Sequence, residues 1–239
     1  MFVFPIILYR HRNSVAVKNT QKLKMRTKLP KISKTLDQNL VITNNIEASV
    51  DLENEIKDLI NRSYHPFYAC MHKDPDKYCR MDYDPEHSIL DHISRNEQFC
   101  LYFEHQLAGT IRFSVPELTL NPNTKIEEMT SYIGLLAIDP KYSKNGFSNL
   151  MMNFSKELFS RLNKSEKLEE LKVVRLTLLT LTPVTSDFLP FRFLEKWYAK
   201  HGFELIHVRD AMEDANAGKL FREKIKYEKL EFKEFEYRL

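Results

Sequence analysis

Residues 134–150 have the sequence GLLAIDPKYSKNGFSNL, and this stretch predicts a strand, a turn and a helix in direct succession. The apolar segment from Gly134 to Ile138 is typical of a buried strand and stops at Asp139-Pro140. A polar turn containing Gly146 follows, and apolar residues at helical spacing begin near Ser148. The free N–H groups of a glycine-bearing turn and of a helix N-terminus attract anions. The stretch therefore predicts a phosphate-binding turn, to which Lys141 and Lys144 add positive charge.

Length and composition fit one globular domain with a short extension. The chain has 239 residues, of which 43% are hydrophobic and 29% are charged. No apolar run reaches the roughly 20 residues that a membrane-spanning helix needs. The cysteines are Cys70, Cys79 and Cys100, an odd number without C-x-x-C spacing, which favours a reducing compartment over a disulfide scaffold.

The basic residues are concentrated at the N-terminus. Residues 1–36 contain nine Lys and Arg and no acidic residue, which leaves 27 basic against 33 acidic residues in the rest of the chain. We interpret this segment as a basic, flexible leader. A mitochondrial presequence and an arm that contacts nucleic acid or an anionic membrane remain alternatives. The expected location is cytoplasmic, with the mitochondrion as the alternative if the leader is a presequence.

Hydrophobic periodicity from Leu36 onward predicts alternating strands and helices. The last strand is expected at or near a sheet edge. The expected strands are 40–43, 98–103, 107–115, 129–138, 173–181, 203–208 and 224–232, and the expected helices are 48–64, 89–95, 148–162 and 191–201. Residues 65–87 and 209–222 are expected to be irregular. Because helices separate the later strands, the pattern indicates an α/β or mixed sheet.

Two motifs about 50 residues apart carry a family resemblance. The first is Ala-Ile-Asp-Pro at 137–140 followed by Ser-Lys-Asn-Gly-Phe-Ser at 143–148. It is similar to the Gln/Arg-x-x-Gly-x-Gly/Ala turn of the GCN5-related N-acetyltransferases (GNAT superfamily), with Ser143 in place of Gln or Arg. The second is FLEKWYAKHGF at 193–203, which resembles the family's Phe-Tyr-x-Lys-x-Gly-Phe. A weaker similarity lies in residues 60–64, INRSY.

The resemblance covers about residues 38–233 and implies an α/β (α+β) fold. Its expected form is a mixed, mostly antiparallel twisted sheet of about six to seven strands, flanked by about four helices, with central parallel strands that splay apart. The expected organisation is a leader at 1–36 and a single N-acetyltransferase domain at 37–239. The implied activity is direct transfer of an acetyl group from acetyl-CoA, as co-substrate, to a primary amine in a ternary complex.

The resemblance also implies roles for particular residues. The cofactor's pyrophosphate would bind the turn, and its pantetheine arm would lie beside the preceding strand, whose amides are oxyanion candidates. Tyr198 is the candidate general acid, since a free tyrosine stays protonated at neutral pH; a core aromatic is the plainer interpretation. The implied cofactor-binding residues are Leu136, Ala137, Ile138, Ser143, Lys144, Asn145, Gly146, Phe147 and Ser148.

The general base and the acceptor are not assigned by the sequence. Tyr132 occupies the position of a Glu found in some members, Glu127 and Glu128 lie near the start of the same strand, and a water relay is a further alternative. Phe191 occupies the position of the family's frequent Asn. The acceptor, a small molecule or a peptide, is expected between residues 62–87 and 209–222, where aromatic and acidic residues would suit a cationic amine. An ordinary solvated loop is the competing interpretation.

Three other kinds of function compete with this interpretation. His65, Cys70, His72, Cys79 and His87 lack the close spacing of a structural metal site, so no metal is expected. The substituted Ser143 leaves open a non-catalytic protein of the same fold that binds acyl-CoA. A nucleic-acid-binding module acting through the leader is the least favoured alternative. The oligomeric state is not predicted.

Overall fold

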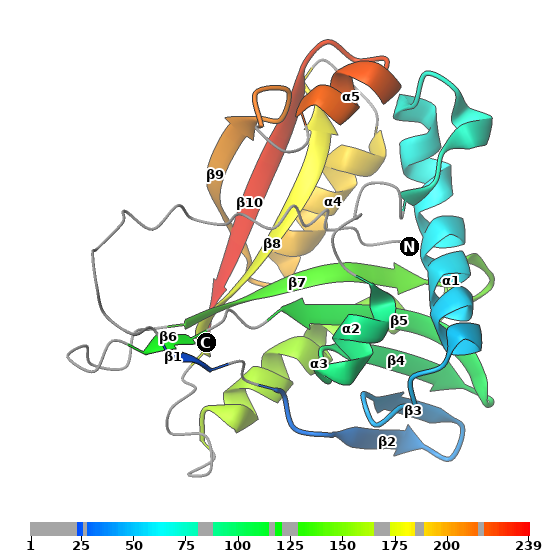
Figure 1. Cartoon of the computed structure of the whole chain (residues 1–239), viewed down its shortest axis with the longest axis vertical. Coiled ribbons are helices and arrows are strands. Elements are labelled where there is room, and N and C mark those ends of the chain that lie inside the picture. Colours follow the sequence, from blue (N-terminus) through cyan, green and yellow to red (C-terminus); the bar gives the residue numbers. More distant parts are fainter. Residues whose placement is uncertain are drawn as a thin grey trace.

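A computed structural model describes residues 23–25, 28–80, 88–114, 118–120, 129–164, 173–184, 189–214 and 218–239. Most of its strands form one eight-stranded mixed sheet (Figure 1). Across the sheet the strands are β2 (Ser33–Asp37), β3 (Leu40–Thr43), β4 (Gln98–Phe103), β5 (Gln106–Ser114), β7 (Met129–Ile138), β8 (Val173–Pro183), β10 (Leu230–Arg238) and β9 (Glu204–Asp210). All neighbouring strands are antiparallel except β7 and β8, which are parallel.

The parallel strands separate partway along their length. Their pairing runs from Met129 with Val173 to Tyr132 with Thr177, although β7 continues to Ile138 and β8 to Pro183. Figure 1 shows the two strands starting side by side and then diverging, with β7 ending beside the first long helix. We call the diverging parts, residues 133–138 and 178–183, the fork. The fork confirms the expected splayed central strands.

Helices cover both faces of the sheet. They are α1 (Val50–Tyr68), α2 (Ile89–Ser94), α3 (Phe147–Leu162), α4 (Leu189–Lys200) and α5 (Gly218–Lys224), with short 3-10 helices at Ala69–Met71, Pro75–Lys77 and Pro140–Tyr142. The rings of Phe99 and Phe113 contact Phe154 and Phe159 of α3. Arg112, the neighbour of Phe113 on β5, reaches His92 of α2 on the opposite face.

The sheet has one strand more than the upper expectation, and the described part has one helix more. The added strand is β2, whose first residues fall within the range assigned to the leader; so does β1 (Leu23–Met25), which pairs with β6 (Leu118–Leu120) in a separate two-stranded sheet. The added helix is α5, in a segment expected to be irregular. The segment Ser33–Asp37 is mostly polar and mostly exposed. It therefore lacks the alternation of apolar and polar residues from which a strand is predicted, although it pairs with β3.

Two predicted elements have boundaries that differ from the structure by more than two residues. Helix α1 passes through Pro66 to Tyr68, because Tyr68 lies one turn after Tyr64 and is buried with it. The last strand is Leu230–Arg238 rather than 224–232, and it lies next to the edge strand β9, which agrees with the expected position at or near an edge. Ile225, which suggested that strand, follows α5 and makes an isolated bridge with His72.

Candidate active site

Strand β7 carries an irregularity at the fork. Thr110 pairs with Ala137 and Arg112 pairs with Gly134, so Leu135 and Leu136 together stand opposite one residue of β5. Leu135 has φ 46°, a left-handed conformation that costs a non-glycine residue about 1–2 kcal/mol. Such bulges redirect a strand and are frequent beside functional sites. The bulge turns β7 at the point where it leaves β8.

Beyond the bulge, β7 presents alternate backbone groups to the fork. The amide of Asp139 donates to the Ala108 carbonyl of β5 at 2.9 Å. In an antiparallel pair every second residue forms hydrogen bonds with the neighbouring strand. The amide of Ala137 therefore points to β5, and the amide of Ile138 points away from it. On the same open edge, Ser63 Oγ of α1 donates to the Ile138 carbonyl at 2.7 Å. Tyr64 Oη donates to the Leu136 carbonyl at 3.5 Å. Of the predicted strand residues, Leu136 and Ile138 therefore offer backbone to the fork, and the Ala137 amide does not.

The turn after β7 is held at its ends by Asp139 and Phe147, and its middle residues are exposed. Asp139 Oδ1 accepts a hydrogen bond from the Lys141 amide at 3.0 Å. Asp139 Oδ2 forms an ion pair with Arg62 Nη2 at 2.9 Å. Phe147 is buried, with its ring 5.4 Å from that of Phe103. Lys144, Asn145 and Gly146 are exposed, whereas Ser143 is half-buried and Ser148 is buried.

Gly146 is the N-cap of α3 and has φ 74°, the conformation that favours glycine. The first hydrogen bond within the helix is from the Leu150 amide to the Gly146 carbonyl at 3.1 Å. The amides of residues 147–149 lie before it and have no acceptor within the helix. No side-chain cap and no acidic residue of the first turn competes for them. The sequence prediction of a helix start near Ser148 is correct within one residue, and this end of α3 is suited to an anion.

Lys141 and Lys144, the two lysines expected to add positive charge to the turn, differ in their surroundings. Lys141 Nζ donates to Gln106 Oε1 at 2.9 Å and lies 4.7 Å from the centre of the Tyr142 ring. It is therefore directed toward the turn between β4 and β5. Lys144 is exposed within the turn itself.

Strand β8 contributes two buried hydroxyls to the other side of the fork. Thr180 and Thr182 are almost fully buried, and their Oγ1 atoms have no hydrogen-bond partner among the described residues. Thr180 lies opposite Lys233, which forms an ion pair with Glu195 of α4, so both threonines face α4. A buried hydroxyl without a partner is costly, and a ligand with amide groups would satisfy it.

Tyr198 lies on α4 and is fully buried. Its ring centre is 5.1 Å from that of Phe235 on β10 and 6.4 Å from that of Phe203. Phe235 is the cross-strand partner of Leu178, the first residue of the fork on β8. The burial of Tyr198 fits the plainer interpretation of a core aromatic, and its place against this strand pair keeps it near the base of the fork.

Asn149, in the first turn of α3, joins the end of the Gly146 turn to α4, which carries Tyr198. Its Oδ1 accepts hydrogen bonds from Trp197 Nε1 at 2.8 Å and from His201 Nε2 at 3.1 Å. Burial, helped by Lys156 and Lys200, lowers the pKa of His201 to about 4, so this ring is neutral at pH 7. Gly146 and Tyr198 thus belong to helices that pack together on one face of the sheet. A lone Asn on an amphipathic helix gave no sequence signal for this role.

The two segments predicted to hold the acceptor lie together (Figure 1). Lys73 Nζ donates to the Arg222 carbonyl of the second segment at 2.7 Å. Just beyond that segment, the Lys73 amide donates to the Lys224 carbonyl at 2.8 Å, and the Lys226 amide donates to the Met71 carbonyl at 3.0 Å. Residues 62–68 belong to α1 rather than to a loop. Residues 81–87, with Asp82, Tyr83, Asp84 and His87, lie outside the described residues, as do Glu127 and Glu128.

Buried aromatic rings cluster where these two segments meet. Tyr64 stacks on Tyr68 with ring centres 5.9 Å apart, and Tyr68 stacks on Tyr78 at 6.5 Å. All three are buried, and burial raises the pKa of Tyr68, with Tyr64 adding to the effect. His65 and His72 both approach Tyr78 edge-on.

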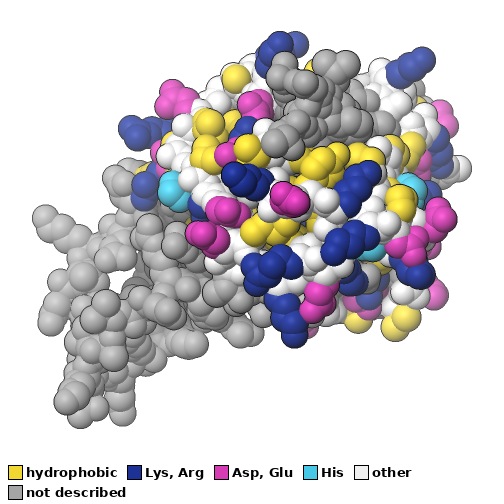
Figure 2. All heavy atoms as spheres, turned by 90° about the horizontal axis from the view of Figure 1, so that it is seen from above, with side chains coloured by type: hydrophobic (Ala, Val, Ile, Leu, Met, Phe, Trp, Pro, Cys, Tyr) yellow, Lys and Arg dark blue, Asp and Glu magenta, His cyan; other side chains and the backbone are white. Residues whose placement is uncertain are grey.

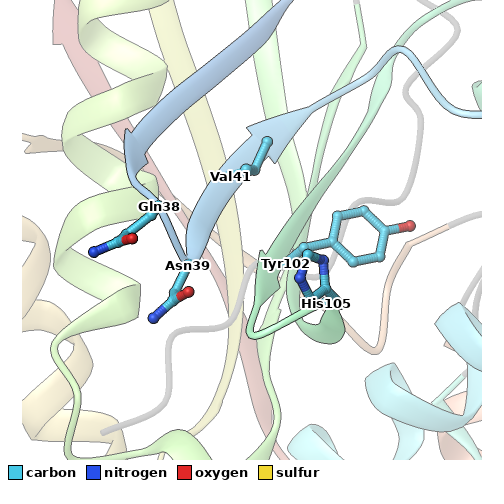
Figure 3. A pocket seen from close by; sticks show the side chains of 5 residues that line it. All are labelled: Gln38, Asn39, Val41, Tyr102 and His105. Carbon is cyan, nitrogen blue, oxygen red and sulfur yellow. The ribbon is translucent and has the colours of Figure 1, made fainter.

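The described residues were expected to hold no metal, and they also show no large surface of one charge in the view of Figure 2. Among these residues no group of three or more His, Cys, Asp and Glu could hold a metal ion, and Cys70, Cys79 and Cys100, which all lie in the described part, form no disulfide. A hollow of about 270 Å³ lies on Gln38, Asn39, Val41, Tyr102 and His105, which include none of the predicted site residues (Figure 3). The face in Figure 2, seen from the α5 end, mixes basic and acidic side chains rather than collecting charge of one sign. No helix in the described ranges is both long and apolar enough to cross a membrane.

Comparison with solved structures identifies the fold. A mosquito arylalkylamine N-acetyltransferase-like protein, 5b, superposes with TM-score 0.51 at 14% identity, over 84% of this chain and 100% of that one. PaiA N-acetyltransferase of Thermoplasma acidophilum in complex with coenzyme A gives 0.48 at 14%, over 84% and 100%. A GNAT-family acetyltransferase of Streptococcus pneumoniae gives 0.46 at 15%, over 84% and 99%. No model of a known protein family matches the sequence, and no curated protein matches it. The chain has the fold of the GCN5-related N-acetyltransferases, as the sequence motifs predicted.

Proposed function

We propose that this protein is an acetyl-CoA-dependent N-acetyltransferase that transfers the acetyl group directly to a primary amine. The observation that carries the proposal is the fork between β7 and β8, together with the uncapped N-terminus of α3 at the end of β7. A long ligand with a phosphate end and an amide-bearing arm suits this combination. Its phosphates would accept bonds from the amides around Gly146, and its arm would lie along the fork.

Both sides of the fork have hydrogen-bonding groups for such an arm. On β7 the Ile138 amide points to the open edge, and on β8 Thr180 and Thr182 have buried hydroxyls without partners in the described structure. The α1 side chains that hold the carbonyls of Leu136 and Ile138 would keep this edge in place. Acetyl-CoA is the co-substrate that we place there.

The chemical step would proceed within a ternary complex. The neutral amine attacks the thioester carbonyl carbon, and the oxygen that gains charge is stabilised by the Ile138 amide. The C–S bond then breaks, and the leaving thiolate takes a proton from the Tyr198 hydroxyl. The amine loses a proton to a base that we leave unassigned among Tyr132, Glu127, Glu128 and bound water. A tyrosine is suited to the acid role because it remains protonated at neutral pH.

Two measurements test the proposal. Titration calorimetry with acetyl-CoA should show binding, and a free-thiol assay with a panel of amines should show coenzyme A release that depends on the amine. Absence of acetyl-CoA binding would contradict the proposal. A separate measurement tests the nucleic-acid alternative: removal of residues 1–22, which stops before β1, β2 and the buried Leu29, should leave thiol release unchanged and lower any salt-dependent affinity for nucleic acid.

One second candidate has observations in its favour. Ser143 and Phe191 replace residues frequent in the family, and Tyr198 is enclosed by aromatic rings. These features would suit a non-catalytic protein that binds acyl-CoA. Micromolar acetyl-CoA binding without thiol release on any amine would favour that function.

A further inference from the structure

Arg80 is a fully buried arginine whose charge has no acceptor in the described structure. None of its three guanidinium nitrogens makes a hydrogen bond, and no carboxylate of the described residues pairs with it. Arg112 provides the contrast. It is equally buried, but it bonds His92 Nε2 at 3.0 Å, and His92 in turn meets Glu97 at 2.6 Å. Arg112 therefore belongs to an internal polar network, and Arg80 does not.

An unpaired buried guanidinium needs an anion. Arginine does not lose its proton in proteins, so burial cannot be relieved by neutralisation. The Arg80 guanidinium carbon lies 5.3 Å from the centre of the Tyr64 ring, and this cation–π contact offsets only part of the lost hydration. Its hydrogen-bond donors remain unsatisfied, and a carboxylate with two oxygens matches their planar arrangement.

The position of Arg80 relates this charge to the fork. The Tyr64 ring that contacts Arg80 carries the hydroxyl that donates to the Leu136 carbonyl on the open edge of β7. One tyrosine therefore separates the guanidinium from the strand beside which we place the thioester. Tyr68 and Tyr78 continue the stack on the acceptor side.

We propose that Arg80 binds a carboxylate of the acceptor, so that the amine to be acetylated belongs to a small amino acid-like molecule rather than to a purely cationic amine. This inference rests on the proposed acetyltransferase function and defines its substrate class. The stacked tyrosines would hold the apolar part of the acceptor, while the guanidinium fixes its acidic group. Arg80 is thus a residue that determines specificity.

The test uses acceptors in matched pairs, each an amino acid and the amine that its decarboxylation gives. Suitable pairs are phenylalanine with phenethylamine, lysine with cadaverine, and ornithine with putrescine. For the wild-type protein, kcat/KM from thiol release should favour the amino acid of at least one pair by about tenfold or more, because the analogue leaves the buried charge unpaired. Arg80→Met should remove that preference, and Arg80→Lys should keep part of it.

Stability measurements separate this role from a structural one. Because Arg80 has no hydrogen-bond partner in the described part of the chain, Arg80→Met should leave the Tm of the ligand-free protein unchanged or raise it. Arg112→Met should lower the Tm and keep the preference for the amino acid. A lower Tm for Arg80→Met, with the preference intact, would show that a carboxylate of the chain itself, such as Asp82 or Asp84, pairs with Arg80, and would overturn the inference.

The inference and the proposed function fail in different ways. Equal kcat/KM for both members of every pair would overturn the inference and leave the acetyltransferase. If no amine supports thiol release, the acetyltransferase fails, and carboxylate binding is decided by thermal shift with phenylalanine and with phenethylamine. A rise in Tm with phenylalanine alone, lost in Arg80→Met, supports the anion site; no rise in the wild-type protein overturns it.

Discussion

Replacement of Gly146 by alanine separates the backbone role of this residue from its role toward a ligand. Gly146 has φ 74°, and a Cβ added there would meet no atom within 4 Å. The cost to stability is therefore conformational, about 1–2 kcal/mol for a left-handed alanine, less about 0.4–1 kcal/mol from the stiffer unfolded chain. For a chain of 239 residues we expect a Tm lower by about 2–4 °C or less.

The effect on acetyl-CoA should be larger than the effect on folding. A phosphate that approaches the Gly146 backbone would meet the new methyl group, which lies in open space on the ligand-free protein. We expect the Kd for acetyl-CoA, measured by titration calorimetry at a temperature where both proteins are folded, to rise by about tenfold or more, equivalent to about 1.4 kcal/mol.

Gly202 supplies the matched control. It has φ 81° at the end of α4, and an added Cβ would lie 3.1 Å from a Tyr237 ring carbon. Gly202→Ala should therefore lose at least as much stability as Gly146→Ala while it keeps the acetyl-CoA affinity of the wild-type protein. An unchanged Kd in Gly146→Ala, or equal losses of affinity in both variants, would refute the phosphate-binding role of the turn.

Three further predictions concern the helices around the fork. Tyr198→Phe should slow thiol release with little change in acetyl-CoA affinity, and equal turnover would show that this hydroxyl is not the acid. Ser63→Ala should lower the free energy of unfolding by about 1–3 kcal/mol in a denaturant titration, because the buried Ile138 carbonyl loses its donor; a change below about 0.5 kcal/mol would mean that another donor replaces it. The pKa of His201 falls from 6.5 in the unfolded chain to about 4 in the folded one, so the unfolded state binds the proton first and stability should fall as the pH drops from 6.5 to 4, by at most about 1.4 kcal/mol per pH unit. Comparison of wild type with His201→Gln across this window isolates the effect, and identical pH slopes would contradict it.

Much of the fold could be predicted from local patterns in the sequence. Strand β4 has the predicted bounds, and the strand, turn and helix around Gly146 follow in the predicted order. Gly202 ends α4 in the left-handed conformation expected after a helix. These features depend on periodicity and on backbone preferences of single residues, which neighbours in the chain largely decide.

Features that depend on distant partners were predicted poorly. The pairing of β2, the extension of α1 to Tyr68 and the bounds of β10 follow from burial against other elements, which overrides local preference. Leu135 gave no signal, because a leucine in a left-handed conformation contradicts its own propensity and persists only where the surrounding sheet holds it.

For this protein, the sequence alone determined the glycine-bearing turn before α3 and the order of the elements, since both are encoded in adjacent residues. Tertiary structure alone decided how the site is assembled. Asn149 meets residues 48 and 52 positions away, Ser63 reaches a carbonyl 75 positions away, and Arg80 is buried without a described partner. Burial, pairing and the divergence of β7 from β8 are properties of the packed chain, because each depends on which distant segments exclude water together.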